Sequence, residues 1–349
     1  MLVGLPSPGP GRASMRGARR TESPVVGSSG RDGRTVAGMN LDHGIHVIDT
    51  GFVRPHLDAA YLIVERGRGA FIDCGVNHSV PHLLAALAQA GLTPGDVDWL
   101  ILTHVHLDHA GGAGELLRRL PNAKLVVHPR GVRHMVDPTA LMAGASAVYG
   151  EDVVRRTYGT LTPVPPGRIV EATEGLELVL GSRRLTVFDT PGHARHHVCY
   201  RDHGASAFFT GDTFGISYRE FDTARGAFIF PTSTPVQFEP EAMKASIARM
   251  AACQPEAMYL THYSRVTDVA RLAAELIEQV DQLVALAQAA DGHADRHERL
   301  VESLHALFAA RAAAHGCTLG AAQVRELLAL DAELNAQGLE VWLDRARAA

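Results

Sequence analysis

The sequence predicts an α/β (α+β) layered domain followed by a helical C-terminal region. Of the 349 residues, 46% are hydrophobic and 20% are charged, which is typical of a globular protein and argues against wholesale disorder. Between residues 43 and 264, short apolar runs of strand length alternate with turns and helical patterns. After Thr267 only helical spacing remains. No apolar run reaches the roughly 18 residues that a membrane-spanning helix needs.

The first 38 residues differ in composition from the rest. They contain six Arg, no Lys and two acidic residues, and they are rich in Gly, Ser and Pro, so we expect residues 1–38 to be a disordered arm. They lack the apolar core of a secretory signal. A transit peptide and a true start at Met39 are both open alternatives. The arm carries +4, which leaves 27 basic and 36 acidic residues, or −9, on residues 39–349 and argues against a nucleic-acid partner.

The expected elements follow from local patterns, taken in chain order. Apolar runs predict strands over residues 44–50, 60–65, 70–74, 99–103, 124–127, 185–189, 198–200, 207–210 and 257–260. Helical spacing predicts helices over residues 81–90 and 112–120, and helical fragments within residues 129–168.

Two segments in the second half allow more than one interpretation. Residues 213–240 form a long connection rich in aromatic side chains, which is either a lid or a peripheral hairpin that packs its own aromatics. Residues 266–349 contain amphipathic helices, one of which is expected to end at Gly338 before a short helix over 339–346. Packing against the preceding domain, residues 39–265, is the favoured role of these helices. A dimer seam and a cap over a site are alternatives.

Four potential metal ligands lie within six residues, directly after an apolar strand: His104, His106, Asp108 and His109. In an extended segment, residues two apart point the same way, so His104 and His106 can hold one ion. Asp108 and His109 then face a neighbouring position. Imidazole nitrogen and carboxylate oxygen suit Zn, Fe or Mn. A clustered surface patch would explain any two of these residues but not all four after a buried strand.

Three later strands also end just before a ligand-type residue. The strand over 185–189 precedes His193, the strand over 207–210 precedes Asp212, and the strand over 257–260 precedes His262. One such junction carries little information. Four of them predict that one edge of a sheet is lined for metal binding.

The segment HVHLDH followed by AGG, together with DTPGH, TGD and a late TH, resembles the metallo-β-lactamase-fold hydrolase superfamily over about residues 43–264. The resemblance implies an αββα sandwich with two divalent metal ions at one edge of two facing sheets, and makes residues 39–265 the catalytic domain. Zinc is the favoured metal, with iron or manganese as alternatives. The family pattern assigns His104, His106 and His193 to the first metal, Asp108, His109 and His262 to the second, and Asp212 to both.

The resemblance also implies the chemistry. A hydroxide that bridges the two metals would attack an ester-type bond, with Asp108 as the catalytic residue that orients it. A thioester or another small ester is the favoured substrate. Lactone or phosphodiester hydrolysis and an iron-dependent redox or oxygenase reaction are the alternatives. The complete ligand set argues against a metal-free binding module.

The remaining histidines and the partners are expected to be less distinctive. For His196 and His197, a plain loop position is favoured over a hydrogen bond to a ligand carboxylate, which is the alternative. The histidines of the helical region are expected to be solvated: His293, His297, His305 and His315. Asp49, Asp73 and Cys74 are expected to support the site rather than bind metal. The expected partner is a small molecule, with neither a nucleic acid nor a membrane. A homodimer through the helical region is possible in this interpretation.

The cysteines indicate the compartment. Four cysteines are far apart and form no CxxC pair, which argues against a disulfide framework. The pattern favours a reducing environment, and we expect a cytoplasmic protein.

Overall fold

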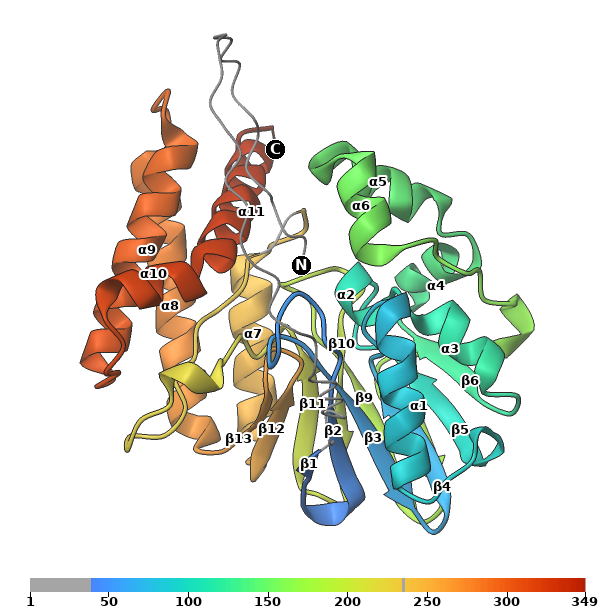
Figure 1. Cartoon of the computed structure of the whole chain (residues 1–349). Coiled ribbons are helices and arrows are strands. Elements are labelled where there is room, and N and C mark those ends of the chain that lie inside the picture. Colours follow the sequence, from blue (N-terminus) through green and yellow to red (C-terminus); the bar gives the residue numbers. More distant parts are fainter. Residues whose placement is uncertain (1–38, 234–235, 349) are drawn as a thin grey trace, which may run out of the picture.

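The computed structural model of the chain is a four-layer αββα sandwich extended by C-terminal helices (Figure 1), which confirms the predicted fold class. The structure describes residues 39–233 and 236–348. The predicted arm over residues 1–38 lies outside the described residues. None of the described helices is long and apolar enough to cross a bilayer.

Two mixed sheets form the centre of the sandwich. The first has the order β1 (Met39–Asn40), β2 (Ile45–Asp49), β3 (Ala59–Glu65), β4 (Arg68–Ile72), β5 (Val97–Ile101), β6 (Lys124–Val127) and β7 (Ile169–Glu171). The second has the order β13 (Ser264–Val266), β12 (Ala257–Leu260), β11 (Ala207–Gly211), β10 (Val198–Asp202), β9 (Arg183–Asp189) and β8 (Glu177–Leu180). The pairs from β4 to β7 are parallel, as is β11 with β12, and the other pairs are antiparallel.

Helices cover both outer faces. Those associated with the first sheet are α1 (Val80–Gln89), α2 (Leu107–Ala110), α3 (Ala113–Arg119), α4 (Pro129–Val136), α5 (Thr139–Tyr149) and α6 (Glu151–Tyr158). Those beyond the second sheet are α7 (Pro240–Ala252), α8 (Val269–Ala290), α9 (Arg296–Ala314), α10 (Ala321–Leu327) and α11 (Ala329–Ala348). Figure 1 shows the first group on the right and the second on the left.

Alternating side chains create three apolar layers. In β3, Ile63 faces the space between the sheets, whereas Leu62 packs toward α1. In β11, Phe209 faces the same central space, whereas Phe208 joins a core with α7 and α8. Because successive strand residues point to opposite faces, strands covered on both sides become continuous apolar runs. This is the pattern that made most strands predictable.

Besides the two-residue β1, the strands that the predicted set lacks are β7, β8 and β13. β7 and β13 have three residues each, and β8 alternates exposed and buried positions. These strands lie at the edges of their sheets. An edge strand pairs with only one neighbouring strand, and when it is also short it contains too few apolar residues to give a recognisable pattern.

Two expectations for the helical region are wrong. α11 continues through Gly338, which is buried between the buried residues Ala336 and Leu339. Interior glycine costs a helix only about 1 kcal/mol relative to alanine, and burial of its neighbours offsets this. His305 and His315 are also buried, not solvated, with 8% and 7% of their surface exposed.

The connection over residues 213–240 packs into the core rather than covering a site with its aromatics. Phe214, Tyr218 and Phe230 are fully buried in the cluster that contains α8, α9 and α11. The Phe230 ring lies 5.1 Å from that of Phe308. Of the two expectations for this segment, packing holds for its aromatic residues. The boundary expected at residue 265/266 falls within β13, just before α8.

A buried acid links this connection to α11. The Tyr218 hydroxyl donates to Asp331 Oδ1 at 3.1 Å, and both residues are at most 1% exposed. Burial raises the pKa of Asp331 to about 7. An aspartate side chain in the unfolded chain has a pKa of about 3.9. The folded state therefore binds the Asp331 proton more tightly than the unfolded chain does. Folding stability therefore falls as the pH rises from about 4 to about 7.

We expect Asp331→Asn to remove this dependence, because an amide oxygen can still accept the Tyr218 hydrogen bond without a charge. The melting temperature of the variant should exceed that of the wild type by a few degrees at pH 8 and by less at pH 5. Thermal unfolding followed by circular dichroism at both pH values measures this, with the exposed Glu298→Gln as control. Equal differences at the two pH values would contradict the assignment.

Candidate metal centre

The structure brings all seven predicted ligands together at one end of the sandwich. They follow the ends of four strands, β5, β9, β11 and β12, and two of them lie in the short helix α2. Six are buried and His106 is half-buried. Strand ends from both sheets thus converge on one small volume.

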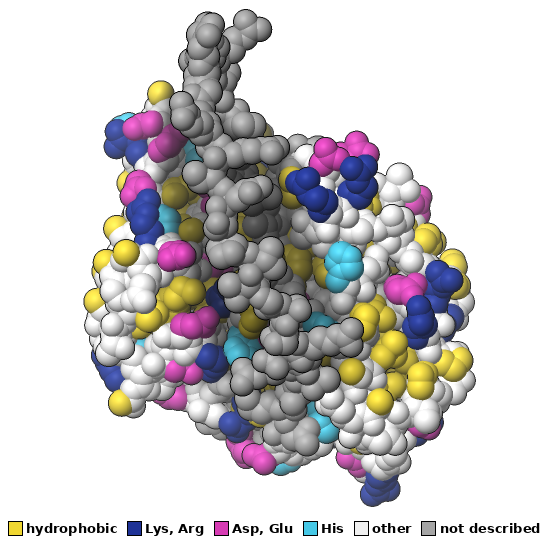
Figure 2. Space-filling model, in the orientation of Figure 1, with side chains coloured by type: hydrophobic (Ala, Val, Ile, Leu, Met, Phe, Trp, Pro, Cys, Tyr) yellow, Lys and Arg dark blue, Asp and Glu magenta, His cyan; other side chains and the backbone are white. Residues whose placement is uncertain are grey.

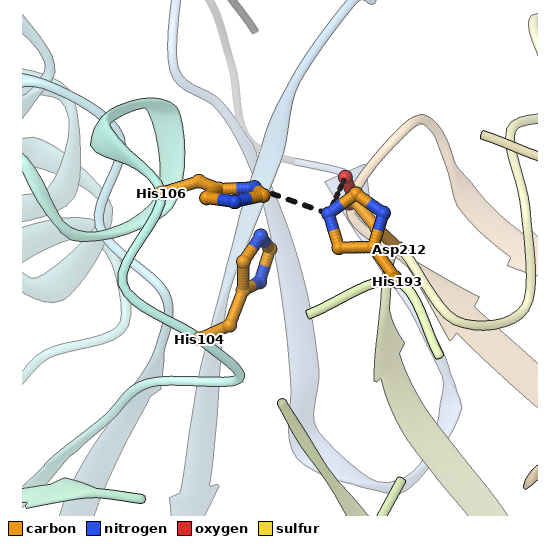
Figure 3. Close-up of side chains that lie close together, drawn as sticks. All are labelled: His104, His106, His193 and Asp212. Carbon is orange, nitrogen blue, oxygen red and sulfur yellow. Dashed lines mark hydrogen bonds and ion pairs between the residues drawn. The ribbon is translucent and has the colours of Figure 1, made fainter. Parts of the chain in front are cut away.

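The side chains form two adjacent groups. In each group the possible ligand atoms lie within 4.8 Å of one another. The first group (Figure 3) contains His104, His106, His193 and Asp212. The second contains Asp108, His109 and His262.

Asp212 lies between the two groups. Its Oδ2 is 3.4 Å from His193 Nε2 in the first group. Its Oδ1 is 3.2 Å from His109 Nε2 and 3.5 Å from His262 Nε2 in the second. Each carboxylate oxygen therefore faces a different group, which is the arrangement that a bridging ligand requires.

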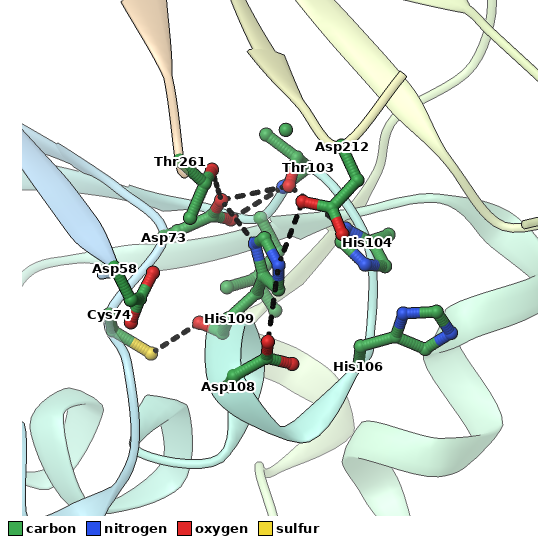
Figure 4. A network of polar contacts seen from close by, with 12 residues as sticks. Asp58, Asp73, Cys74, Thr103, His104, His106, Asp108, His109, Asp212 and Thr261 are labelled. Atoms are coloured by element: carbon green, nitrogen blue, oxygen red, sulfur yellow. Dashed lines mark hydrogen bonds and ion pairs between the residues drawn. The ribbon is translucent and has the colours of Figure 1, made fainter. Parts of the chain in front are cut away.

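Outer contacts fix the orientation of the imidazole rings. His262 Nδ1 donates to the Leu57 carbonyl at 2.9 Å, and His109 Nδ1 donates to Asp73 Oδ2 at 3.0 Å. With Nδ1 held on the outside, Nε2 of each ring points to the centre. Asp73 also accepts hydrogen bonds from the Thr103 and Thr261 hydroxyls (Figure 4). Asp73 thus supports the ligands from behind, as the sequence predicted.

The buried atoms in the centre fit two divalent cations. The Nε2 atoms of His104, His109 and His262 are buried and make no hydrogen bond to the part of the chain that the structure describes. Leaving such groups unpaired costs about 1–3 kcal/mol each, so their convergence indicates a missing partner. Five imidazoles and two carboxylates match the donors that Zn²⁺ and related first-row ions prefer.

The electrostatics of the site agree with this fit. Burial lowers the pKa of His104 and His262, so these rings are neutral, as metal ligands must be. Burial also opposes protonation of His109, but the carboxylates of Asp212 and Asp108 raise its pKa above the ordinary value. A positive charge is therefore favoured next to these carboxylates, and a cation can replace the proton.

Glycines position two of the ligands. Gly211, just before Asp212, has φ +49°, and a Cβ there would lie 2.5 Å from His197 Nε2. Gly192, just before His193, has φ +134°, and its Cβ would lie 2.3 Å from the Met243 backbone. Only glycine accepts both the conformation and the lack of space.

Two further residues complete the surroundings. His197 is fully buried, and its Nε2 accepts a hydrogen bond from the backbone N–H of Asp212 at 3.2 Å, so it holds the backbone of this ligand rather than its carboxylate. Asp58, which sequence analysis missed, lies beside the second group, and burial raises its pKa well above the usual range. Thr50 donates to Asp58 Oδ2 at 2.7 Å. Asp58 lies in a loop without a recognisable motif, so no sequence signal marked it.

The sequence comparisons agree with this geometry. The profile of the Metallo-beta-lactamase superfamily matches residues 53–262. A metallo-beta-lactamase fold-containing protein of Sulfurisphaera tokodaii, ST1585, is 27% identical over 224 residues, which are 63% of this chain and 78% of that protein. The crystal structure of ST1585 has a TM-score of 0.61 at 23% identity and covers 85% of this chain and 98% of its own. This likeness shows the fold.

Two relatives are named for their activity. The hydroxyacylglutathione hydrolase of Acidiphilium cryptum is 28% identical over 216 residues, 61% of this chain and 67% of that enzyme. The acyl-coenzyme A thioesterase MBLAC2 of Gallus gallus is 28% identical over 168 residues, 44% of this chain and 56% of that enzyme. The chain thus spans little more than half of the second relative.

Loss of the bridging carboxylate should weaken both halves of the centre. We expect Asp212→Ala to bind less than one equivalent of metal and His104→Ala to bind about one equivalent fewer than the wild type, while both keep the fold. Elemental analysis after reconstitution with zinc measures this, with the exposed His203→Ala as control. Two full equivalents in Asp212→Ala would rule out the bridging role.

Asp73→Asn tests the outer support of His109. The amide keeps the size of the side chain but is a weaker acceptor for the ring N–H, so metal affinity should fall about 10- to 100-fold. Competition with a chromophoric chelator gives this affinity. The matched control is Asp49→Asn, whose carboxylate accepts hydrogen bonds from two loop N–H groups instead. An equal loss in both variants would assign the effect to folding.

Proposed function

The chain belongs to the metallo-beta-lactamase superfamily, and from this premise we propose that it is a hydrolase that cleaves a thioester or another small ester with two divalent metal ions. The convergence around Asp212 of buried imidazole nitrogens that make no hydrogen bond to the described residues carries the proposal. The names of the two enzyme relatives support the choice of a thioester.

When bound by these residues, two divalent cations would supply hydroxide near neutral pH and would polarise the bond under attack. The residues of the chain hold and orient the reactants around them. The Asp108 carboxylate lies 3.7 Å from His262 Nε2 and 3.8 Å from His109 Nε2. As an acceptor without a proton of its own, it can take a hydrogen bond from the attacking water and so orient it.

The cysteines close to the centre do not support a covalent route. Cys74 and Cys199 are fully buried, and burial raises the pKa of both thiols, that of Cys199 to about 12. The thiolate is the nucleophilic form, so these side chains are inert at neutral pH. Attack by water is therefore favoured over a thioester formed with the protein.

Zinc is the proposed metal, since the donor set is dominated by imidazole. A cytoplasmic location is proposed because all four cysteines are free thiols. A small-molecule substrate and a homodimer through the helical region stay predictions, as do the expected lack of nucleic-acid and membrane partners.

The proposal is tested by turnover of a neutral thioester, S-acetyl-N-acetylcysteamine, beside lactone, phosphodiester, aryl sulfate and β-lactam substrates. We expect the zinc-loaded protein to favour the thioester, to lose activity with a chelator and to regain it with zinc. Asp212→Ala should lower kcat/KM by more than about a hundredfold, because losing a ligand exceeds the usual effect of losing an outer partner. A metal-loaded protein that cleaves another class and leaves the thioester intact would refute the proposed substrate.

A further inference from the structure

An open cleft of about 430 Å³ lies beside the metal centre. Its lining comes from α4, from the loop that follows His193 and from the segment before α7. The lining residues are Pro129, Arg130, Arg133, His134, Arg195, His196 and Gln237. Nothing in the chemistry proposed above uses these side chains.

His196 is the wall between this cleft and the centre. Its ring is stacked on that of His104 with the centroids 6.2 Å apart, and meets the ring of His106 edge-on at 5.6 Å. Its Nδ1 accepts a hydrogen bond from the backbone N–H of Val105, with the two nitrogens 3.5 Å apart. A group bound in the cleft is therefore separated from the first ligand group by a single imidazole ring.

The cleft is basic in an otherwise acidic chain. Its lining contains three arginines and no carboxylate, whereas residues 39–349 carry a net −9. Burial lowers the pKa of His196 to about 3, and burial and Arg133 lower that of His134, so the arginines supply the positive charge. Arg130 and Arg133 are three residues apart on α4 and so lie on the same face of the helix.

Two of these arginines form no ion pair with the described residues. Arg130 donates instead to the Arg195 carbonyl at 3.3 Å, and Arg133 Nε lies 3.2 Å from His134 Nε2. Figure 2 shows basic and acidic side chains next to one another at several places on the visible surface. Many arginines form ion pairs, such as Arg119 with Glu115 and Arg325 with Glu302. Within residues 39–233 and 236–348, no carboxylate lies within ion-pair distance of Arg130 or Arg133. Arg195, by contrast, pairs with Glu239 at 2.6 Å.

We propose that this cleft binds an anionic group of the substrate, a carboxylate or a phosphate, through Arg130 and Arg133. The inference rests on the proposed function, since it places this group on an ester that reaches the metal centre past His196. Guanidinium groups bind both oxyanions in a bidentate manner. The amide of Gln237, which lines the cleft, adds a neutral hydrogen-bonding group.

The test is calorimetric binding of thioethers that cannot be hydrolysed to the zinc-loaded protein. The probes are S-ethyl-N-acetylcysteamine, which is neutral, S-ethyl-3-mercaptopropionate and S-ethyl-2-mercaptoethyl phosphate. We expect at least one of the anionic probes to bind about tenfold more tightly than the neutral one. Comparing the affinities of the two anionic probes shows whether the cleft prefers a carboxylate or a phosphate. Arg133→Gln should abolish the preference and Arg133→Lys should keep part of it.

Arg118→Gln, at an exposed arginine on α3, is the control and should leave binding unchanged. An anionic probe that binds Arg133→Gln as tightly as the wild type would overturn the proposal, as would equal affinity for all three probes. These outcomes do not depend on turnover.

Hydrolysis separates this inference from the proposed function. Arg133→Gln should raise KM rather than lower kcat for an anionic thioester, S-acetyl-3-mercaptopropionate. The control Arg118→Gln should leave kcat/KM within about twofold of the wild type for both this substrate and S-acetyl-N-acetylcysteamine. Arg133-dependent binding without hydrolysis of any thioester would refute the proposed function and keep the anion site. Hydrolysis without Arg133-dependent binding would refute the anion site alone.

Discussion

The packing of seven side chains of metal-ligand type into one largely buried volume is the constraint on which the rest of the structure depends. Several of their polar atoms have no hydrogen-bonding partner among the described residues, and each such atom costs about 1–3 kcal/mol. A folded chain tolerates this only where the surroundings prevent the rings from turning away. The glycines before His193 and Asp212, and the outer acceptors of the ring Nδ1 atoms, serve this purpose.

The C-terminal helices contribute to the same constraint from a distance. Asn335 on α11 accepts a hydrogen bond from the Ser233 N–H at 2.7 Å. The neighbouring carbonyl, that of Thr232, lies 3.5 Å from Nδ1 of the ligand His193. α11 therefore fixes the backbone that faces a metal ligand. Together with the core shared by α8, α9 and the second sheet, this contact makes the helical region part of the architecture of the site.

The sequence predicted which seven side chains converge because each lies a short distance past the end of an apolar strand, and the register of a buried strand fixes where its end lies. Features that depend on packing across the chain were not predictable in this way. Gly338 resembles a helix end until the buried face of α11 is known, and His305 resembles a surface residue until α9 is packed. Asp58 enters the site through a loop whose path only the assembled fold determines.

The same reasoning locates substrate selection outside the metal ligands. Two cations among histidines and carboxylates can activate water against many bonds, so the ligand set by itself selects no substrate. Substrate selection must come from side chains that contact the parts of the substrate away from the scissile bond. In a chain whose described part is acidic, a cleft with two arginines that form no ion pair with the described residues concentrates positive potential at one place. This potential attracts anions to the cleft, whereas the acidic remainder of the surface repels them. The His196 ring lies between that cleft and His104 and His106. The arginines of the cleft would therefore recognise the charge of the substrate, while the adjacent metal centre would hold its scissile bond.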